Sequence, residues 1–479
     1  MLRFFYRYKY SVKLTPSLLI AVLLYGCASS SQVDKQLRSA NVPQNWQFSE
    51  KTIPVAGNWL GQFKQPKLNL MVDEALLNNQ TLRQNAYDVQ ILEQQLLQAD
   101  ADFWPDLDLT LNTGRSKSIN GVISNNSSVE LESSYELDIW GKLSAAQKQA
   151  NLNYLAAKAN YEQNRQTLVA NVVTSWFDWI AAKQLLALYE QRVKNAQQNL
   201  DIIESGYQQG INAALDVYLS RNELNTELSN LAEQQVTQIQ ATRSLERLLG
   251  RYPDASLTNE QLSLPLLTND IPIGMPSDII SRKPELLSSW YQVLAQDAGL
   301  AFAHKQRFPS ISLRASISDS ADELSDLLSG SSLAWSLLGG LTAPLFKAGD
   351  LKAIEEIARL RLKQQEQIYL DTLYNAFSSV ENAITTENSL KLRYQSTLAA
   401  QQNADAAETL AFEQYQRGLV TYTTVLEAQS RSFTAQSALI QIKNQLLANR
   451  IVLHVALGGD FTDTNNLQDN KQEDVLINE

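Results

Sequence analysis

The chain of 479 residues repeats itself once, and this duplication constrains its fold more than any other feature. Phe103-Trp104-Pro105 corresponds to Arg307-Phe308-Pro309 at a spacing of 204 residues, whereas later landmarks keep a spacing of 208. We therefore expect a difference of four residues, accommodated in a loop. Three glycine pairs hold the larger spacing: Gly141 and Gly349, Gly210 and Gly418, and Gly250 and Gly458.

Each half also contains a long stretch without helix breakers. Proline is absent between Pro105 and Pro253 and again after Pro344. Between residues 142 and 209 the only glycine is Gly206, and between residues 351 and 417 there is none. Each stretch predicts one very long helix, which at 1.5 Å per residue would reach roughly 100 Å and exceed the diameter of a globular domain.

Apolar residues in the first long helix recur every seven positions, which is typical of a coiled coil. A solitary dimeric coiled coil would show the same pattern, but it does not account for the segments that precede each helix. Two series carry the repeat: Leu186, Val193, Leu200 and Tyr207, and Tyr189, Ala196, Ile203 and Gly210.

The segments before the long helices alternate between apolar and polar residues, which predicts strands. In the first half these are residues 106–112 and 129–139, with residues 114–128 as a polar loop, and in the second half residues 311–318 and 333–342. Strands of about ten residues are long enough to cross a bilayer when tilted. A soluble sandwich built from the same hairpins is the alternative.

Four strands cannot span a membrane alone, because their open edges would expose unpaired backbone groups to lipid. Three copies would supply twelve strands, an even number within the known range. We therefore predict a membrane α/β barrel, internally duplicated, in which each of three protomers contributes four strands to a twelve-stranded transmembrane β-barrel that is continued by long helices.

The N-terminus resembles an export signal followed by a lipidation site. Residues 1–26 combine a basic start with an apolar stretch that is too short to span a bilayer, and Cys27, the only cysteine, follows directly. We expect an N-acyl diacylglycerol lipid on Cys27 and no other cofactor. Ala28 is not the aspartate that retains lipoproteins in the inner membrane. An ordinary signal peptide cut nearby, with Cys27 discarded or left free, is the alternative.

Charge and residue usage argue against a nucleic-acid partner and against catalysis. Removal of residues 1–26 would take away four basic residues and no acid, so the net charge would fall from −11 to −15. The chain has two histidines, His304 and His454, and no P-loop, Rossmann or zinc-binding spacing. We therefore expect a protein that is not an enzyme and binds no metal.

Taken together, these residues resemble the outer-membrane efflux factors of the TolC/OprM/NodT type over residues 58–459. The resemblance implies a homotrimer whose twelve-stranded barrel contacts outer-membrane lipid and whose long α-helical barrel extends into the periplasm. There the tube meets a periplasmic adaptor (membrane fusion protein) and an inner-membrane RND-type transporter. It also implies passive export of small molecules such as drugs. The matching pieces are Trp59, Phe63, Pro66, Leu68, Ala75, Leu76, Asn79, Leu82, residues 276–286 (PSDIISRKPEL), 308–313 (FPSISL), 344–346 (PLF) and 425–429 (VLEAQ).

The resemblance also implies a periplasmic gate beside the two Tyr-x-x-Gly turns that end in Gly210 and Gly418. Asp216 matches the acidic lock residue of the family and Tyr415 matches its tyrosine partner. Val420 replaces a family arginine. The plainer interpretation is that Asp216 is an acid in the first turn of a helix, favoured by the helix dipole, and that Tyr415 packs in the helix seam.

Two further gate positions carry over, at which the family has aspartates. One holds Thr424 and the other Glu427. Three copies of Glu427 would form a ring that attracts cations. Alternatively, Glu427 is a solvated helix former.

The predicted organisation follows the repeats, and other functions remain open on the same fold. The alternatives are a type I protein-secretion conduit, a metal-ion efflux channel and a non-channel periplasmic scaffold anchored by its lipid. A metal-ion channel would favour Met or His clusters, which the chain lacks. The predicted segments are 1–26 signal peptide, 27–66 lipidated extended segment, 67–255 first repeat, 256–275 linker, 276–459 second repeat and 460–479 acidic tail.

Overall fold

The computed structural model describes residues 42–47, 57–257, 263–267, 272–328 and 332–461. The predicted signal peptide, Cys27 and nearly all of the acidic tail lie outside the described residues. Among the helices that are described, none is both long and apolar enough to cross a membrane. The chain consists of two compact units, which we describe separately: a sheet unit (residues 94–153 and 292–366) and a helical unit (residues 36–93, 154–291 and 367–479).

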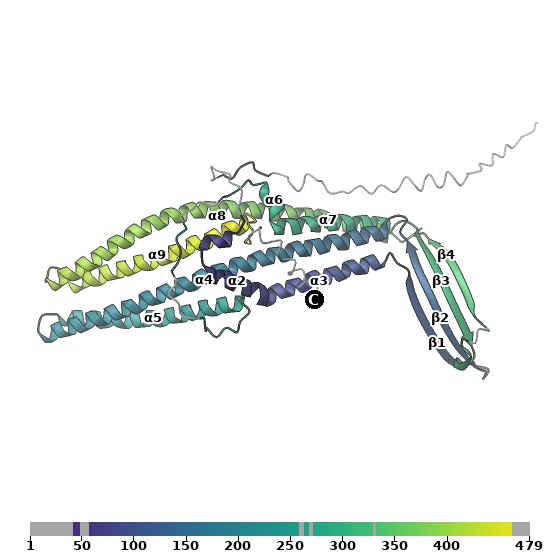
Figure 1. The fold of residues 1–479 in the computed structure, drawn as a ribbon, viewed down its shortest axis with the longest axis horizontal. Helices are drawn as coiled ribbons and strands as arrows, with labels where there is room; N and C mark the ends of the chain where they lie inside the picture. Colours follow the sequence, from purple (N-terminus) through teal and green to yellow (C-terminus); the bar gives the residue numbers. More distant parts are fainter. Residues whose placement is uncertain (1–41, 48–56, 258–262, 268–271, 329–331, 462–479) are drawn as a thin grey trace, which may run out of the picture. The chain divides into compact units, whose positions relative to one another are not determined.

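The elements follow the same order in the two halves of the sequence (Figure 1). In the first half they are η2 (Trp59–Phe63), α2 (Pro66–Asn78), α3 (Gln80–Ala101), β1 (Asp106–Lys117), β2 (Ile123–Leu137), α4 (Lys142–Gln208) and α5 (Ala214–Leu248). In the second half they are α6 (Asp278–Arg282), α7 (Pro284–Lys305), β3 (Ser310–Ala321), η3 (Leu324–Asp326), β4 (Ala334–Thr342), α8 (Asp350–Gln416) and α9 (Tyr422–Ala456).

The duplication extends to the ends of the helices. The helices α4 and α8 each have 67 residues, and their first residues lie 208 positions apart, as do those of α5 and α9, which have 35 residues each. Before the sheet, α3 and α7 have 22 residues each and lie 204 positions apart. The length difference falls after β3, in the connection to β4 that contains η3. The two predicted long helices and the predicted loop insertion are therefore confirmed.

The three glycine pairs share a backbone conformation. Their φ angles all lie between 66° and 90°, in the left-handed region that favours glycine over residues with a Cβ. Because each glycine ends or begins a long element, its conformation sets where the chain turns. The boundaries predicted for the two repeats as domains stay a prediction.

The sheet unit contains four antiparallel strands in the order β1-β2-β3-β4. Odd-numbered residues such as Leu109 and Leu337 form an apolar face, and even-numbered residues such as Glu130 and Arg314 form a polar face. The Nε atom of Arg314 lies 2.7 Å from a carboxylate oxygen of Glu132 on this polar face. Each ladder pairs the facing backbone groups of two neighbouring strands, and the alternation along each strand places apolar and charged side chains on opposite faces of the sheet.

One sequence prediction is wrong in extent. Residues 114–128, expected to form a polar loop, continue both strands, and only residues 118–122 make the turn. Hydroxyl groups explain why polar residues extend the ladder here. The Oγ1 atom of Thr113 lies 3.2 Å from Oγ of Ser127, and the Oγ atoms of Ser116 and Ser124 are 2.9 Å apart. Such cross-strand pairs stabilise a hairpin without apolar side chains.

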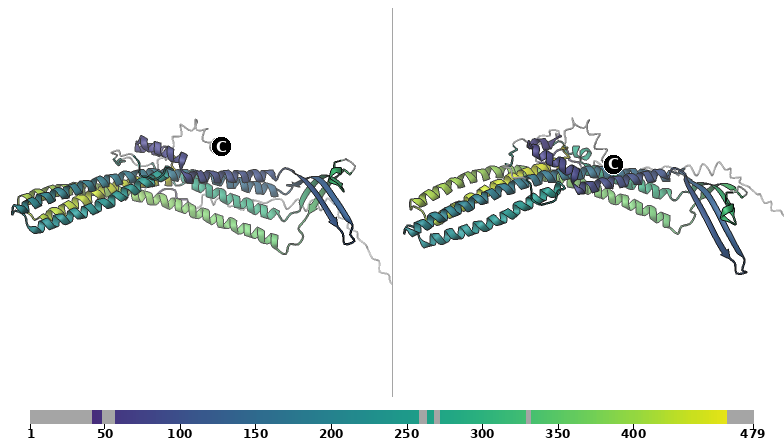
Figure 2. Two further views of the ribbon diagram at one scale, coloured as in Figure 1. Left: turned by 90° about the horizontal axis from the view of Figure 1, so that it is seen from below. Right: turned by 60° about the horizontal axis from the view of Figure 1, so that its bottom comes forward.

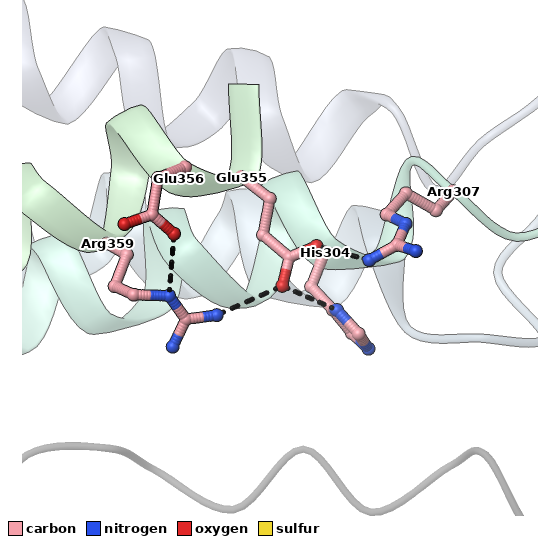
Figure 3. A network of polar contacts seen from close by, with 5 residues as sticks. All are labelled: His304, Arg307, Glu355, Glu356 and Arg359. Carbon is pink, nitrogen blue, oxygen red and sulfur yellow. Dashed lines mark hydrogen bonds and ion pairs between the residues drawn. The ribbon is translucent and has the colours of Figure 1, made fainter. Parts of the chain in front are cut away.

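A carboxylate joins α7 to α8 in the sheet unit (Figure 3). Glu355 on α8 lies 3.2 Å from Nδ1 of His304, and it accepts hydrogen bonds of 2.6 Å from Arg307 and 3.2 Å from Arg359. Burial opposes ionisation of Glu355, but the hydrogen bonds from Arg307 and His304 outweigh it and lower the pKa of the carboxyl group. The network holds the helix end before β3 against the helix start after β4.

In the helical unit, α4 pairs with α5 and α8 pairs with α9, as Figure 1 and the right view of Figure 2 show. The buried heptad residues Ala196, Leu200 and Ile203 confirm a packed seam on α4. A polar contact pins each pair: Arg192 on α4 lies 2.7 Å from the buried Glu227 on α5, and Asp405 on α8 accepts from Ser432 on α9 at 2.7 Å. A separate core contains Trp59, Phe63, Trp176, Phe177, Ile180 and Leu245.

Candidate functional site: the helical tip

Two short turns, residues 209–213 and 417–421, form what we call the tip turns. The first connects α4 to α5 and the second connects α8 to α9. The amide of Gly210 donates to the carbonyl of Tyr207 at 3.0 Å, and the amide of Gly418 donates to the carbonyl of Tyr415 at 2.8 Å. Both glycines have a φ of 73° and open space where a Cβ would stand. Backbone conformation, not crowding, therefore requires glycine in the tip turns.

The first tip turn has a side-chain cap that the second lacks. Asn212 donates from Nδ2 to the carbonyl oxygen of Ile203 at 3.1 Å, which ties the turn back to the last turns of α4. A Cβ on Gly206 would collide with the Asn212 side chain, which explains the single glycine in α4. At the corresponding positions the second repeat has Gln414 and Val420. The two tip turns are therefore related in backbone but not in side-chain chemistry.

Two tyrosines of the second repeat contact polar groups of the first. The Tyr415 hydroxyl donates to Oδ1 of Asn212 at 3.3 Å, and the Tyr422 hydroxyl donates to Oγ of Ser220 at 3.4 Å. Their ring centroids are 5.4 Å apart, and Tyr422 is almost fully buried beside Val425. These contacts connect α8 and α9 to the first tip turn and the start of α5.

Asp216 and Tyr415, the predicted lock pair, line one groove of about 870 Å³ between the tip turns, and Val420 lines it too. Asp216 lies in the first turn of α5, where the helix dipole favours an acid. Burial and then the charge of Asp216 raise the pKa of Tyr415, so the phenol stays protonated and able to donate. Within one chain the Tyr415 hydroxyl donates to Asn212 and not to Asp216.

Thr424 and Glu427 lie outside this groove, on the exposed side of α9. The Oγ1 atom of Thr424 is 3.3 Å from Oγ1 of Thr421 at the start of the helix. Glu427 forms an ion pair of 2.6 Å with Arg431 one turn later, and both side chains are more than 60% exposed. An exposed pair of this kind contributes little to stability and leaves the carboxylate reachable.

The sequence did not predict roles for Asn212, Ser220 and Tyr422. The site residues were inferred by their positions relative to family gate residues, and these three do not match any of those. Gly206 carried the one available signal, since an isolated glycine in a long helix indicates close packing. In the part of the chain that the structure describes, no three histidine, cysteine or acidic side chains gather where they could hold a metal ion. The contacts that hold the two tip turns are hydrogen bonds between polar side chains and backbone groups.

The chain thus combines a four-stranded antiparallel sheet, two helices of 67 residues and a polar helical tip. The family model described as outer membrane efflux protein matches residues 71–251 and 275–459. The chain belongs to this family of efflux channels, which are not enzymes.

Relatives and solved structures agree with this assignment. The cation efflux system protein CusC of Escherichia coli K12 is 29% identical over 459 residues, which cover 92% of this chain and 98% of that protein. The probable outer membrane lipoprotein SilC of Salmonella typhimurium is 27% identical and covers 92% and 97%. A crystal structure of CusC superposes with a TM-score of 0.79 at 29% identity, covering 87% of this chain and 97% of that chain.

The predicted fold class, efflux function and location are thereby confirmed. The chain is a protomer of the TolC-type α/β barrel, and it serves as the outer-membrane channel component of an efflux pump in a Gram-negative bacterium, extending into the periplasm.

Proposed function

We propose that three copies of this chain form one conduit, and that the tip turns are its gate. The conduit would take solutes from an inner-membrane RND-type transporter through a periplasmic adaptor. The proposal is supported chiefly by the groove between the tip turns, where Asp216 and Tyr415 face the same space. A passage closed by hydrogen bonds between helix ends can open without breaking the packed helix pairs behind it.

The gate works through the second tip turn. When Tyr415 donates to Asn212, α8 is tied to the first repeat; when the bond breaks, α8 and α9 gain freedom relative to α4 and α5. Asp216 is close enough for its charge to raise the pKa of Tyr415, and it is the acceptor that we propose for this hydroxyl once the bond to Asn212 breaks. Gly210 and Gly418 serve as the fixed bends about which the helix ends are held.

Three copies of Glu427 would form a ring that attracts cations, and Thr424 lies one helical turn away on α9. Arg431 reduces the negative charge of this ring, because its guanidinium pairs with Glu427 at 2.6 Å. Movement of Arg431 away from the carboxylate would therefore strengthen the attraction for cations at the gate.

A lipid on Cys27 would anchor each protomer in the outer membrane. The name of SilC supports this, since that relative is described as a probable outer membrane lipoprotein. The residues after Cys27 that are described also hold the N-terminal segment to the helical unit. Trp46 donates from Nε1 to the carbonyl of Gly274 at 3.1 Å, and the Trp59 amide donates to the carbonyl of Asp460 at 3.3 Å.

The cargo we propose is a range of small molecules, including drugs, that the pump selects and the conduit passes on. Cations are a second candidate, favoured by the polar face of the sheet. Glu130, Glu132 and Glu136 on β2 face the same way as Asp108 on β1. Arg314 forms an ion pair with Glu132 and Lys142 forms one with Glu136, so the acids of this face outnumber the bases that pair with them. CusC is named for cation efflux, which agrees with such a face.

Purified full-length protein in planar bilayers tests the conduit. We expect ion conductance and an oligomer on gels that dissociates on heating, whereas a lipid-anchored scaffold would give neither. A deletion strain then separates the cargoes. Lost drug tolerance supports small molecules, and lost tolerance of metal cations alone supports cations. Loss of a secreted polypeptide would contradict both in favour of protein export.

A further inference from the structure

The first and last strands of the sheet, β1 and β4, each have one edge without a strand neighbour in the described part of the chain. An open edge exposes backbone N–H and C=O groups, and such groups are not tolerated in lipid. The proposed homotrimer requires these two edges to meet between protomers. Trimer formation alone does not determine which residues of β4 lie opposite which residues of β1, because two strands can pair in several registers.

The chain contains an internal example of the same joint. The ladder between β2 and β3 connects the last strand of the first repeat to the first strand of the second, with Ser133 opposite Ala315 and Ser134 opposite Arg314. A joint between protomers would likewise connect β4, the last strand of the second repeat, to β1, the first strand of another copy. The internal ladder is therefore a template for the joint between copies.

The two hairpins show how to transfer the register. Asp106 lies opposite Ser134 in the first hairpin, and Ser310 lies opposite Thr342 in the second. The strand β1 thus maps onto β3 by 204 positions and β2 maps onto β4 by 208. The flanking helices of the two repeats are related by the same two spacings, so strands and helices of the first repeat correspond to those of the second in the same way.

We infer that β4 of one protomer pairs with β1 of the next in the register that places Leu341 opposite the partner's Leu111 and Thr342 opposite the partner's Thr110. The inference rests on the proposed homotrimer. The side chains agree with it: Leu341 and Leu111 both lie on the apolar face and are exposed in the single chain, whereas both threonines lie on the polar face. A shift of one residue would turn one set of leucines toward the polar face.

Aromatic residues at the ends of the strands support the same joint. Within the chain, Trp140 stacks on Phe308 at 5.5 Å between centroids and donates from Nε1 to the carbonyl of Pro309 at 2.6 Å. Lys305 adds a hydrogen bond of 2.9 Å to the carbonyl of Gly141. Three contacts therefore hold the place where β2 leads into α4 against the place where α7 leads into β3.

At the joint between copies the corresponding residues differ. Ala348 replaces Trp140 and Ala101 replaces Lys305, so the two polar contacts are lost, whereas Trp104 takes the place of Phe308. Three large apolar side chains nearby are among the most exposed in the single chain: Trp104 at 75%, Leu345 at 94% and Phe346 at 88%. Their exposure indicates a partner. The same register places Leu345 opposite the partner's Leu107, next to the start of β1, so Trp104 packs against the Leu345-Phe346 segment of the neighbouring copy.

Cysteine pairs on the water-facing polar side test the register. We would oxidise outer membranes that carry Thr110→Cys with Thr342→Cys and compare them with Asp108→Cys or Asn112→Cys combined with Thr342→Cys. Only the first pair brings Cβ atoms near the separation of about 4 Å that a disulfide needs. We expect roughly fivefold more covalently linked trimer from it than from either shifted pair, and none from the single variants, which control for Cys27.

Unheated gels keep this result separate from the proposed homotrimer. Heat-sensitive trimers in all variants, with the strongest linkage in a shifted pair, would overturn the register and leave the homotrimer standing. Monomers throughout would overturn both. As a second measurement, Trp104→Ala should lower the temperature at which the trimer dissociates, whereas Trp104→Phe should retain it; equal dissociation temperatures would contradict the aromatic contact.

Discussion

The Tyr415 hydroxyl donates to Oδ1 of Asn212 at 3.3 Å, and this bond connects the end of α8 to the tip turn of the other repeat. The same asparagine caps α4 through Ile203 at 3.1 Å. One amide side chain thus serves a structural role with its nitrogen and a connecting role with its oxygen. Loss of the tyrosine hydroxyl should release α8 and leave the cap on α4 in place.

Tyr415→Phe should therefore shift the gate toward its open state. One neutral hydrogen bond contributes about 1 kcal/mol, which corresponds to roughly a fivefold change in the ratio of open to closed channels. The measurement is the open fraction of single channels in planar bilayers. The matched control is Tyr207→Phe, at the corresponding position of the first repeat, where the side chain is 50% exposed. Equal effects of the two substitutions would contradict the role of Tyr415.

Gly206→Ala should act on the same bond from the other side. A Cβ at residue 206 would displace the Asn212 side chain, and with it the acceptor of Tyr415. Stability should change little, because alanine favours helix over glycine by about 1 kcal/mol and offsets the lost cap. We expect a higher open fraction with an unchanged unfolding temperature. Gln414→Ala, at the corresponding position of the second repeat, should leave the open fraction unaltered; a closed Gly206→Ala channel would refute the coupling.

Sequence reasoning recovered the elements whose pattern is periodic or duplicated. The bounds of α4 and α8 follow from absent prolines and the paired glycines, because backbone conformation at Gly141 and Gly349 is a local property. The strand extension over residues 114–128 was missed, since hydroxyl pairs such as Thr113 with Ser127 leave no apolar alternation to detect.

The tip was recovered only in part, for a related reason. Asp216 and Tyr415 were expected together and do line one groove. The acceptor of Tyr415 could not be predicted, because Asn212 and Tyr415 are 203 residues apart and their contact depends on how the two repeats pack. The pairing of Glu427 with Arg431 has a local signal, the spacing of four residues on one helix.

Glu427→Gln should reduce the preference of the channel for cations, because it removes three negative charges from the proposed ring. Arg431→Gln is the informative companion, since it frees the carboxylate from its pair at 2.6 Å and should raise cation preference above that of the wild type. Reversal potentials under a salt gradient measure both. Changes of the same sign in the two variants would argue against a ring at this position.

The buried histidine of α9 predicts how stability depends on pH. His454 is 1% exposed, and its ring stacks on Trp59 at 5.7 Å between centroids. Neither ring nitrogen has a hydrogen-bond partner among the described residues. Burial and then the positive charge of Arg450 lower the pKa of His454 from 6.5 to about 4. The folded protein therefore holds this histidine neutral at pH values where an unfolded chain would protonate it.

The stabilising contribution is present in full above pH 6.5 and is lost as the pH falls from 6.5 to about 4, because only the unfolded state takes up the proton in that range. The difference in pKa corresponds to about 3 kcal/mol per chain. Thermal unfolding of the full-length protein in detergent, followed from pH 8 to pH 4, should show this loss.

His454→Phe keeps a ring against Trp59 and removes the titration, so its unfolding temperature should fall less steeply with pH than that of the wild type. His304→Phe is the control, because His304 is more than one-third exposed and pairs with Glu355. The carboxylates are the same in the wild type and His454→Phe and cancel in that comparison, whereas His304→Phe also removes a contact that lowers the pKa of Glu355. If the wild type and His454→Phe lost stability in parallel, the ring of His454 would have to be protonated in the folded core as readily as in water.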